Sequence, residues 1–385
     1  MPVGPAAWSR TRSRATEPVT TFERKPALSR GLLHSGSGLY LLPRDLLTGD
    51  DAAAAVADGT ARPLAGGPTA FRAVDLMVRS DASVTVARVG LTALADLDIP
   101  DLAGRLERLS AHRPLAEPAD GPMLMGIVNA TPDSFYDGGR HAGSGAAIDH
   151  GMRLAQEGAA ILDVGGESTR PGADPVPIDE EIRRTEPVVR ALADAGHRVS
   201  IDSRNAPVMA AALDAGAAWV NDVSGLTHDP AAAALVAGRG CPVVLMHMRR
   251  DPKTMQVAPS YDCAPLDVYD ELAARVAAAE RAGIARDRIL VDPGYGFAKS
   301  VRHNLEVTSW LALLHGLGCA ILFGASRKSS IAALSRGEPA GDRLPGSLAL
   351  ALAAVARGAQ VLRVHDVAET AQALAVRRAL DAADR

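Results

Sequence analysis

VSIDSRNAPVMAAALDAGAAWVND, residues 199–222, is the stretch that decides the fold. Its two ends, Val199–Asp202 and Trp219–Asp222, are short apolar runs that stop at an acidic residue, as buried strands do. Between them, Ala206–Ala215 has the alanine-rich composition of a helix. A strand, a helix and a second strand in this order indicate a parallel βαβ unit.

The same alternation continues through the chain from about Gly121 to the C-terminus. The eight predicted strands are Leu124–Val128, Ala160–Val164, Val199–Asp202, Trp219–Asp222, Val243–Met246, Ile289–Asp292, Ala320–Phe323 and Gln360–Val364. Predicted helices between them include Asp179–Ala195, Ala206–Ala215, Leu266–Ala282 and Leu348–Arg357. Eight such units in about 250 residues predict an α/β fold, a (β/α)₈ TIM barrel. A doubly wound open sheet is the alternative, but it usually has fewer strands, and no Gly-x-Gly-x-x-Gly turn follows the first strand.

The region before the barrel is organised differently. We expect residues 1–30 to be a disordered tail and residues 31–115 to be a small N-terminal β-containing extension, joined to the catalytic domain at residues 121–385 by a proline-rich linker. The predicted strands of the extension are Leu39–Leu42, Phe71–Val78 and Ser83–Val89. The sequence predicts no function for this extension.

Composition excludes several classes of protein. The 41 basic and 45 acidic residues give a net charge of −4 and form no basic block, so nucleic acid is not an expected partner. All apolar runs are far shorter than the roughly 20 residues of a membrane span. The 3 cysteines have no Cys-x-x-Cys spacing, so neither a disulfide framework nor a zinc site is predicted, and a reducing cytoplasm is expected.

A polar residue stands at or just after the end of each predicted strand. These residues are Asn129, Glu167, Asp202, Asn221, His247, Asp292, Arg327 and His365. In a barrel the carboxyl ends of the strands converge on the face that carries the active site. The alternative is that strands simply end in polar turn residues, which explains one or two such endings better than eight.

Four of the polar residues after strands three, four, six and seven suggest the floor of a pocket. Asp202, Asn221, Asp292 and Lys328 offer two carboxylates, an amide and an ammonium, which suit the alternating donors and acceptors of a flat heterocycle such as a pterin or purine. An ion pair among them is the alternative, since unpaired buried carboxylates are costly.

Strand eight carries a candidate anion site. Arg363 and His365 flank Val364, so in an extended segment both side chains point the same way. The loops after strands seven and eight are a frequent phosphate site of this fold, so a phosphorylated substrate is favoured. Two polar loops, Ala130–Arg140 and Gly165–Ala173, have the composition of lids that close over a substrate, although ordinary connecting loops are an equal alternative.

Seven ordered motifs closely resemble the dihydropteroate synthases. They are GIVNATPDSFYDGGR (126–140), ILDVGGESTRPGA (161–173), SIDSRNAPVMAAALDAGAAWVNDVSG (200–225), VVLMHMRRDPKTMQ (243–256), ILVDPGYGFAKS (289–300), GASRKSSI (324–331) and VLRVHDV (361–367). The resemblance covers the barrel and is absent from roughly the first 115 residues. One departure is Arg249, which follows Met-His-Met where glycine is common in the family.

The resemblance implies a transferase of folate biosynthesis. The family condenses 6-hydroxymethyl-7,8-dihydropterin diphosphate with p-aminobenzoate, gives 7,8-dihydropteroate and pyrophosphate, uses Mg²⁺ and is the target of sulfonamides. The reaction is S_N1-like, because the diphosphate leaves before the aryl amine attacks. By the same resemblance we expect a homodimer.

The resemblance also implies a role for individual residues. Asp202, Asn221, Asp292 and Lys328 match the pterin pocket, Asn129 matches a magnesium-contacting asparagine, and Arg363 and His365 match the diphosphate-binding pair. The p-aminobenzoate and sulfonamide site corresponds to Thr169, Arg170, Pro171, Phe297, Ser326 and Lys328. Asp202, Lys328, Arg363 and His365 are the expected catalytic residues.

Three other functions remain open from the sequence. A non-catalytic paralogue would bind pterin without turnover, and a pterin-dependent methyltransferase would share the barrel and the pterin floor. The methyltransferase has no evident need for the Ser-Thr-Arg-Pro loop or the Arg-x-His pair. A Schiff-base aldolase would use Lys328 as its nucleophile.

Overall fold

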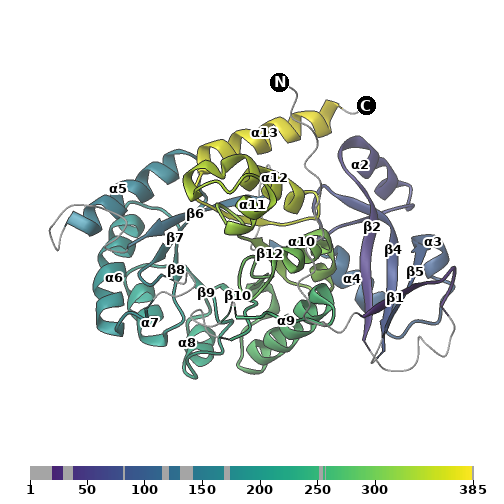
Figure 1. Cartoon of the computed structure of the whole chain (residues 1–385), viewed down its shortest axis with the longest axis horizontal. Coiled ribbons are helices and arrows are strands. Elements are labelled where there is room, and N and C mark those ends of the chain that lie inside the picture. Colours follow the sequence, from purple (N-terminus) through teal and green to yellow (C-terminus); the bar gives the residue numbers. More distant parts are fainter. Residues whose placement is uncertain are drawn as a thin grey trace.

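The core of the molecule is a closed barrel of eight parallel strands, which confirms the predicted fold class (Figure 1). The computed structural model describes residues 20–28, 38–80, 83–114, 121–130, 142–168, 174–250, 255 and 257–383. The barrel strands are β6 (Met123–Asn129), β7 (Ile161–Gly165), β8 (Val199–Asp202), β9 (Trp219–Asp222), β10 (Val243–Met246), β11 (Ile289–Asp292), β12 (Ala320–Phe323) and β13 (Val361–Val364). Strands β8 to β12 have the predicted bounds, β13 starts one residue later than predicted, and β6 and β7 each differ by one residue at both ends.

Helices cover the outside of the barrel. They are α5 (Ala142–Gln156), α6 (Ile178–Asp194), α7 (Ala206–Asp214), α8 (Ala232–Arg239), α9 (Ala264–Arg281), α10 (Val301–Ser309), α11 (Ser329–Leu334), α12 (Leu344–Val355) and α13 (Val367–Ala383), with 3₁₀ turns η3 (Arg286–Arg288), η4 (Leu311–Leu317) and η5 (Ala340–Asp342). Helix α12 starts four residues before the predicted Leu348, because Pro345 fits the first turn of a helix. Within the described ranges, no helix combines the length and the apolarity needed to cross a membrane.

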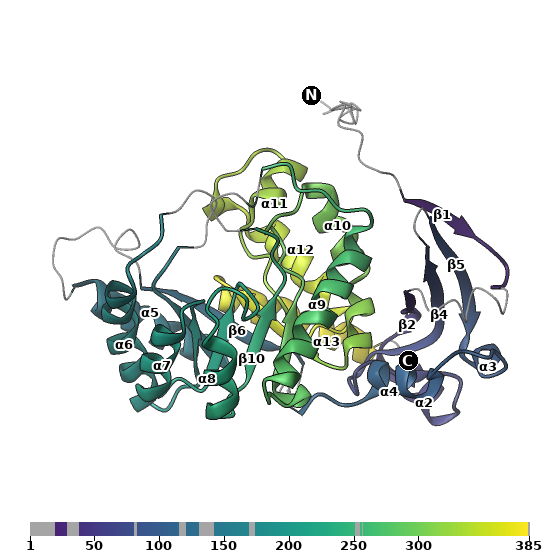
Figure 2. The same ribbon diagram turned by 90° about the horizontal axis from the view of Figure 1, so that it is seen from below.

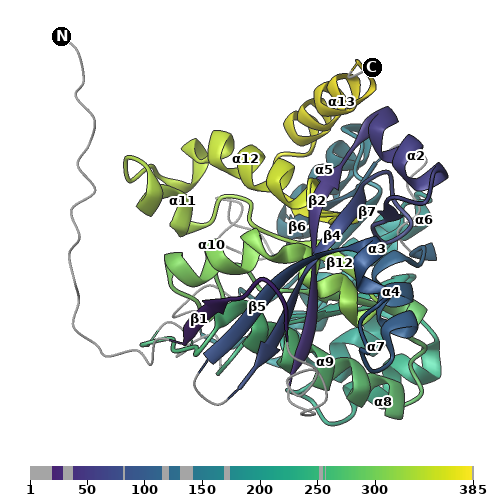
Figure 3. The same ribbon diagram turned by 90° about the vertical axis from the view of Figure 1, so that its right-hand side faces the viewer.

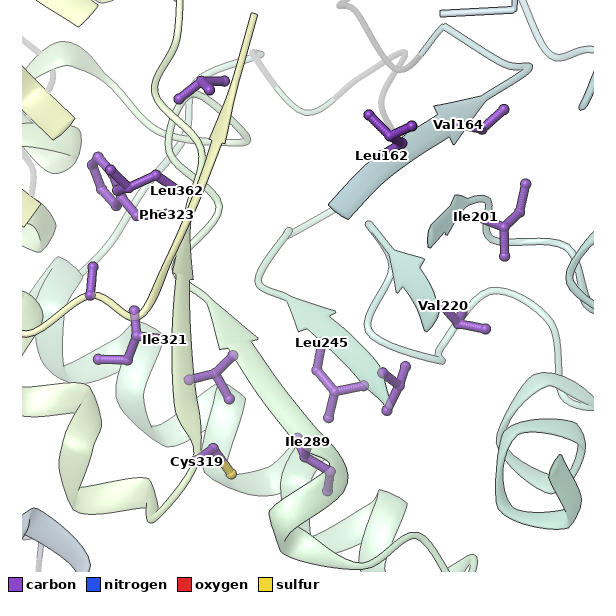
Figure 4. Packing of buried hydrophobic residues seen from close by; sticks show 14 of the residues in the cluster. Leu162, Val164, Ile201, Val220, Leu245, Ile289, Cys319, Ile321, Phe323 and Leu362 are labelled. Atoms are coloured by element: carbon purple, nitrogen blue, oxygen red, sulfur yellow. The ribbon is translucent and has the colours of Figure 1, made fainter. Parts of the chain in front are cut away.

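The two faces of each barrel strand bury different sets of side chains. Residues such as Leu162, Val220, Leu245 and Ile321 belong to the large apolar cluster between the strands and the helices (Figure 4). The alternate residues form a second apolar cluster, which contains Met125, Ile161, Trp219, Val244, Leu290, Ala320, Leu322 and Val361. Because side chains alternate across a strand, this second cluster fills the barrel interior. Its position fixes which residues point inward at the carboxyl ends.

The N-terminal region forms a separate five-stranded sheet with the order β1-β5-β4-β2 and β3 paired to β4. Its strands are β1 (Thr21–Arg24), β2 (Leu39–Leu47), β3 (Arg62–Pro63), β4 (Ala70–Arg79) and β5 (Ser83–Gly90), and its helices are α2 (Gly49–Ala57), α3 (Leu91–Leu94) and α4 (Leu102–Ser110). The three predicted strands are present and longer than predicted. Strand β1 lies within the expected tail, where it pairs with β5 and Phe22 contacts Trp310 edge-on; residues 1–19 lie outside the described residues.

The N-terminal region packs against one side of the barrel, where its sheet lies next to α9 and η4 and its helix α2 lies next to α13 (Figures 2 and 3). Leu266 of α9 and Leu313 of η4 are buried in the same apolar cluster as Leu76 and Met77 of β4. Polar contacts support the packing: Tyr40 donates a hydrogen bond to Asp270 at 2.8 Å. The extension and the barrel therefore share a core.

Candidate active site

A layer of charged and polar side chains lies inside the barrel at the carboxyl ends of the strands. Four members stand two residues after a member of the inner apolar cluster on their own strand, and the fifth, Asp202, stands two residues after the buried Ser200, so all point inward as well. The members are Asp163, Asp202, Asn221, Asp292 and Arg363. We call this set the polar floor.

Arg363 connects the members of the polar floor. Its Nε lies 2.6 Å from Oδ2 of Asp163, and its Nη2 lies 2.6 Å from Oδ2 of Asp202. Asn221 donates its Nδ2 hydrogen to the same Asp163 oxygen at 3.0 Å. The sequence left open whether Asp202 takes part in an ion pair, and the structure shows that it does. The partner is Arg363 of strand eight rather than Lys328.

Asp163 is the member that the sequence did not predict. Its side chain is fully buried, and Oδ1 has no hydrogen-bond partner among the described residues. Asp163 lies within β7 and not after its end, so it does not belong to the polar residues that follow the strands. The alternation of side chains along a strand could have indicated Asp163. Ile161 faces the barrel interior, so Asp163, two residues later, faces it too.

Burial shifts the pKa values of the floor in a consistent direction. It raises the pKa of Asp292 to about 6, although the Gly294 N–H and Lys328 act in the opposite direction. It also raises the pKa of Asp202, against the effect of Arg363. Burial lowers the pKa of Arg363, but Asp163 and Asp202 outweigh burial and raise it, so the guanidinium stays charged.

Loops after β11, β12 and β13 place the other predicted residues. The Lys328 Nζ lies 4.2 Å from the centre of the Phe297 ring. Ser326 accepts a hydrogen bond from the His365 backbone at 3.2 Å and lies 3.0 Å from its Nδ1. Burial lowers the pKa of His365 to about 3, with Arg363 adding to the effect, so the imidazole is neutral in this structure.

Three of the eight residues after strands are held in structural contacts. Glu167 pairs with Arg204 at 3.1 Å, and Arg327 pairs with Asp366 at 3.0 Å. His247 is fully buried and lies 3.0 Å from Glu271. These contacts fit the alternative that some strands end in polar turn residues, and a role of these three residues in the site stays a prediction.

Some predicted site residues lie outside the described residues. These are Thr169, Arg170 and Pro171, together with most of the two predicted lid loops. Asn129 is exposed at the end of β6. In the described part of the chain, no three His, Cys, Asp or Glu side chains gather into a metal-binding cluster.

A closed (β/α)₈ barrel with buried charged side chains at the carboxyl ends of its strands has the architecture of a barrel enzyme, because this face carries the active site in essentially every characterised enzyme of the fold. Residues 125–365 match the model of the pterin binding enzyme family. The dihydropteroate synthase of Escherichia coli is 44% identical over 256 residues, which cover 66% of this chain and 90% of that protein. The chain belongs to the pterin-binding enzymes and, within them, to the family of the dihydropteroate synthases.

Solved structures of relatives match the barrel. The Xanthomonas albilineans dihydropteroate synthase with 4-aminobenzoic acid has a TM-score of 0.65 and 49% identity, and covers 68% of this chain and 94% of its own. The same enzyme with 7,8-dihydropteroate has a TM-score of 0.63 and 46% identity, and the match covers 69% of this chain and 96% of that chain. The Yersinia pestis enzyme in a sulfonamide complex has a TM-score of 0.64 and 41% identity, and the match covers 68% of this chain and 94% of that chain.

Proposed function

We propose that this protein is a dihydropteroate synthase, a transferase of folate biosynthesis. It joins 6-hydroxymethyl-7,8-dihydropterin diphosphate to p-aminobenzoate and releases pyrophosphate. The polar floor is the observation that carries the proposal, because Asp163, Asp202, Asn221 and Asp292 line the barrel end with acceptors for the N–H groups of a pterin ring.

The polar floor also suits the chemistry of the reaction. The bond between the pterin methylene carbon and the diphosphate oxygen breaks first, and the oxygen keeps the electron pair. The floor holds three carboxyl groups against one guanidinium, so it favours the pterin cation that remains. The aryl amine then forms the new C–N bond with its lone pair and loses a proton. This route needs no enzyme nucleophile.

Arg363 and His365 are the proposed contacts of the leaving diphosphate. The Arg363 side chain keeps 22% of its surface exposed while it holds the floor carboxylates, so a substrate can still reach it. The exposed amide of Asn129 suits Mg²⁺, which takes oxygen ligands and is bound largely through water and substrate phosphates, so no protein cluster is needed. When bound, Mg²⁺ would neutralise charge on the diphosphate.

The p-aminobenzoate site is proposed beside Phe297, Ser326 and Lys328, and sulfonamides would compete there. We propose that three further residues complete this p-aminobenzoate site: Thr169, Arg170 and Pro171. Positioning of the amine against the cation is the main contribution of these residues.

A homodimer and a cytoplasmic location are part of the same proposal. Val376 and Leu380 lie one turn apart on α13 and are 57% and 66% exposed, which supports a contact surface there. Cys241, Cys263 and Cys319 are free thiols.

Complementation tests the proposal against a non-catalytic paralogue and a pterin-dependent methyltransferase. Expression of the chain in a strain that lacks dihydropteroate synthase should restore growth without added folate products. Expression of the Asp202→Asn/Asp292→Asn double variant at the same level is the matched control and should not. Pterin binding by the purified protein without complementation would indicate the paralogue.

The affinity for pterin should fall as the pH falls from 7 to 5. Burial raises the pKa of Asp292 to about 6 and that of Asp202 to about 7, so both carboxyls are protonated as the pH falls to 5 and each loses an acceptor for the pterin N–H groups. About one tenth of the Asp292 carboxyls stay ionised one pH unit below their pKa, so Asp292 alone predicts about tenfold weaker binding at pH 5.

Calorimetry with 6-hydroxymethyl-7,8-dihydropterin measures this effect without interference from the ionisation of the diphosphate. In Asp292→Asn the affinity should be weaker and should vary less with pH. An affinity of the unmodified protein that stays constant from pH 7 to 5 would exclude an ionised Asp292 as the pterin acceptor.

A further inference from the structure

Charged side chains form a continuous network from the N-terminal sheet to the active-site end of the barrel. Its first link joins β4 to α9. Arg79, the last residue of β4, places Nη1 2.7 Å from Oδ1 of Asp267 and 3.5 Å from Oδ2 of Asp270. Tyr40 of the same sheet donates a hydrogen bond to Asp270. Two side chains of the sheet thus contact two carboxylates of α9.

The second link joins α9 to the loop after β10. Arg249 lies 3.5 Å from Asp267 and donates from Nε to Glu271 at 2.7 Å. Its guanidinium also stacks on the Tyr261 ring, 4.0 Å from the ring centre.

The third link reaches the loop after β11. Glu271 lies 3.0 Å from Nε2 of His247, and Nδ1 of His247 lies 2.9 Å from the Lys299 Nζ. Lys299 also donates to the carbonyl oxygens of Gly294 and Phe297, each at 3.1 Å. Both His247 and Lys299 are buried. Burial lowers the pKa of His247 to about 3, so a neutral ring accepts from Lys299 and donates to Glu271.

The turn at residues 294–297 connects the two halves of the proposed site. At its start, the Gly294 N–H donates to Asp292 at 2.7 Å. At its end lies Phe297, whose ring faces Lys328. Asp292 is also held by the pairing of β11 with β10, whereas Phe297 lies beyond the strand. Loosening Lys299 should therefore displace Phe297 more than Asp292.

We propose that Arg79 is a positioning residue for the p-aminobenzoate site, and that the N-terminal sheet acts on this site through Asp267, Arg249, Glu271, His247 and Lys299. The proposal rests on the proposed function. It assigns the extension a role in the affinity for the aryl amine and none in the affinity for the pterin.

Steady-state kinetics of Arg79→Gln tests the inference. The KM for p-aminobenzoate should rise about fivefold, the size of one coupling energy within a network, while kcat and the KM for the pterin diphosphate stay within about twofold. Arg79→Lys should restore part of the loss. Arg72→Gln is the matched control, because Arg72 is an exposed arginine of the same strand, and it should change neither KM.

A double variant distinguishes the network from a general loss of packing. Arg249→Gln should raise the KM for p-aminobenzoate by a similar factor, and Arg79→Gln/Arg249→Gln should be no worse than the stronger single variant. Equal changes in the two KM values, or additive effects of the two substitutions, would overturn the inference.

Hydrogen exchange gives a readout that does not depend on activity. The Gly296 amide donates to Asn304 at 2.8 Å and the Phe297 amide to Gly294 at 3.1 Å. Both amides should exchange faster in Arg79→Gln than in the unmodified protein or in Arg72→Gln. If the unmodified protein shows no turnover, the proposed function fails, but the exchange rates still test the positioning. If the Gly296 and Phe297 amides exchange at the same rate in Arg79→Gln as in the unmodified protein, Arg79 does not position this turn.

Discussion

Arg363→Met is expected to lower kcat/KM by about 10³ and to destabilise the fold by about 3–5 kcal/mol. The substitution removes the guanidinium that lies 2.6 Å from both Asp163 and Asp202. Two buried carboxylates then lose their counter-charge, and the proposed contact to the leaving diphosphate is lost with it. Urea denaturation measures the free energy of unfolding, and steady-state kinetics measures kcat/KM.

Arg357→Met is the matched control for stability. Arg357 is also partly buried, but it donates to the backbone oxygens of Ser309 and Ala353 and pairs with no carboxylate among the described residues. Adding Asp202→Asn to Arg363→Met should recover part of the stability and none of the activity. If Arg363→Met destabilises the protein no more than Arg357→Met does, Arg363 does not hold the polar floor together.

Lys328→Met should give the second largest effect, but on activity alone. We expect kcat/KM to fall by about 10²–10³, the usual loss when one preorganised charge at a reacting centre is removed. The side chain is only partly buried and stands at the start of α11, so the free energy of unfolding should change by about 1 kcal/mol or less.

Lys25→Met is the control for the loss of a lysine, because Lys25 is exposed and pairs only with Glu23 at 3.3 Å among the described ion pairs. Lys328→Met should keep its unfolding midpoint in thermal denaturation. A large fall in stability would mean that Lys328 is structural. Trapping of a carbonyl compound on Lys328 by borohydride would instead indicate the aldolase alternative.

The barrel was predictable because its signals are local. Strands such as Val243–Met246 and Ile289–Asp292 are short apolar runs that end at polar residues, so their bounds follow from the sequence. Asp202, Asn221 and Asp292 could be predicted as neighbours for the same reason, since parallel strands end on one face.

The partners within the polar floor could not be predicted in the same way. Arg363 and Asp163 meet only because the barrel closes and brings β13 and β7 to either side of β6. Spacing along the chain predicted that Arg363 and His365 would face one anion. The structure adds that Arg363 also contacts the floor carboxylates and that His365 lies beside Ser326, which only the three-dimensional arrangement could show.

The extension was the least predictable part for a related reason. Strand β1 has four exposed residues without a buried face, so no hydrophobic pattern marks it. The ion pair of Arg79 with Asp267 depends on how the sheet docks on α9. Arg249 stood out only as a departure from the family, and its partners Glu271 and Tyr261 supply a reason for it.

The most direct test of the synthase function is pyrophosphate release by the purified full chain with Mg²⁺ and 6-hydroxymethyl-7,8-dihydropterin diphosphate, with and without p-aminobenzoate. We predict sustained release only with p-aminobenzoate, formation of one 7,8-dihydropteroate per pyrophosphate, and loss of both in Arg363→Met and Lys328→Met. Retained pterin binding without p-aminobenzoate-dependent turnover would contradict the account and indicate a pterin-binding protein that does not catalyse the condensation.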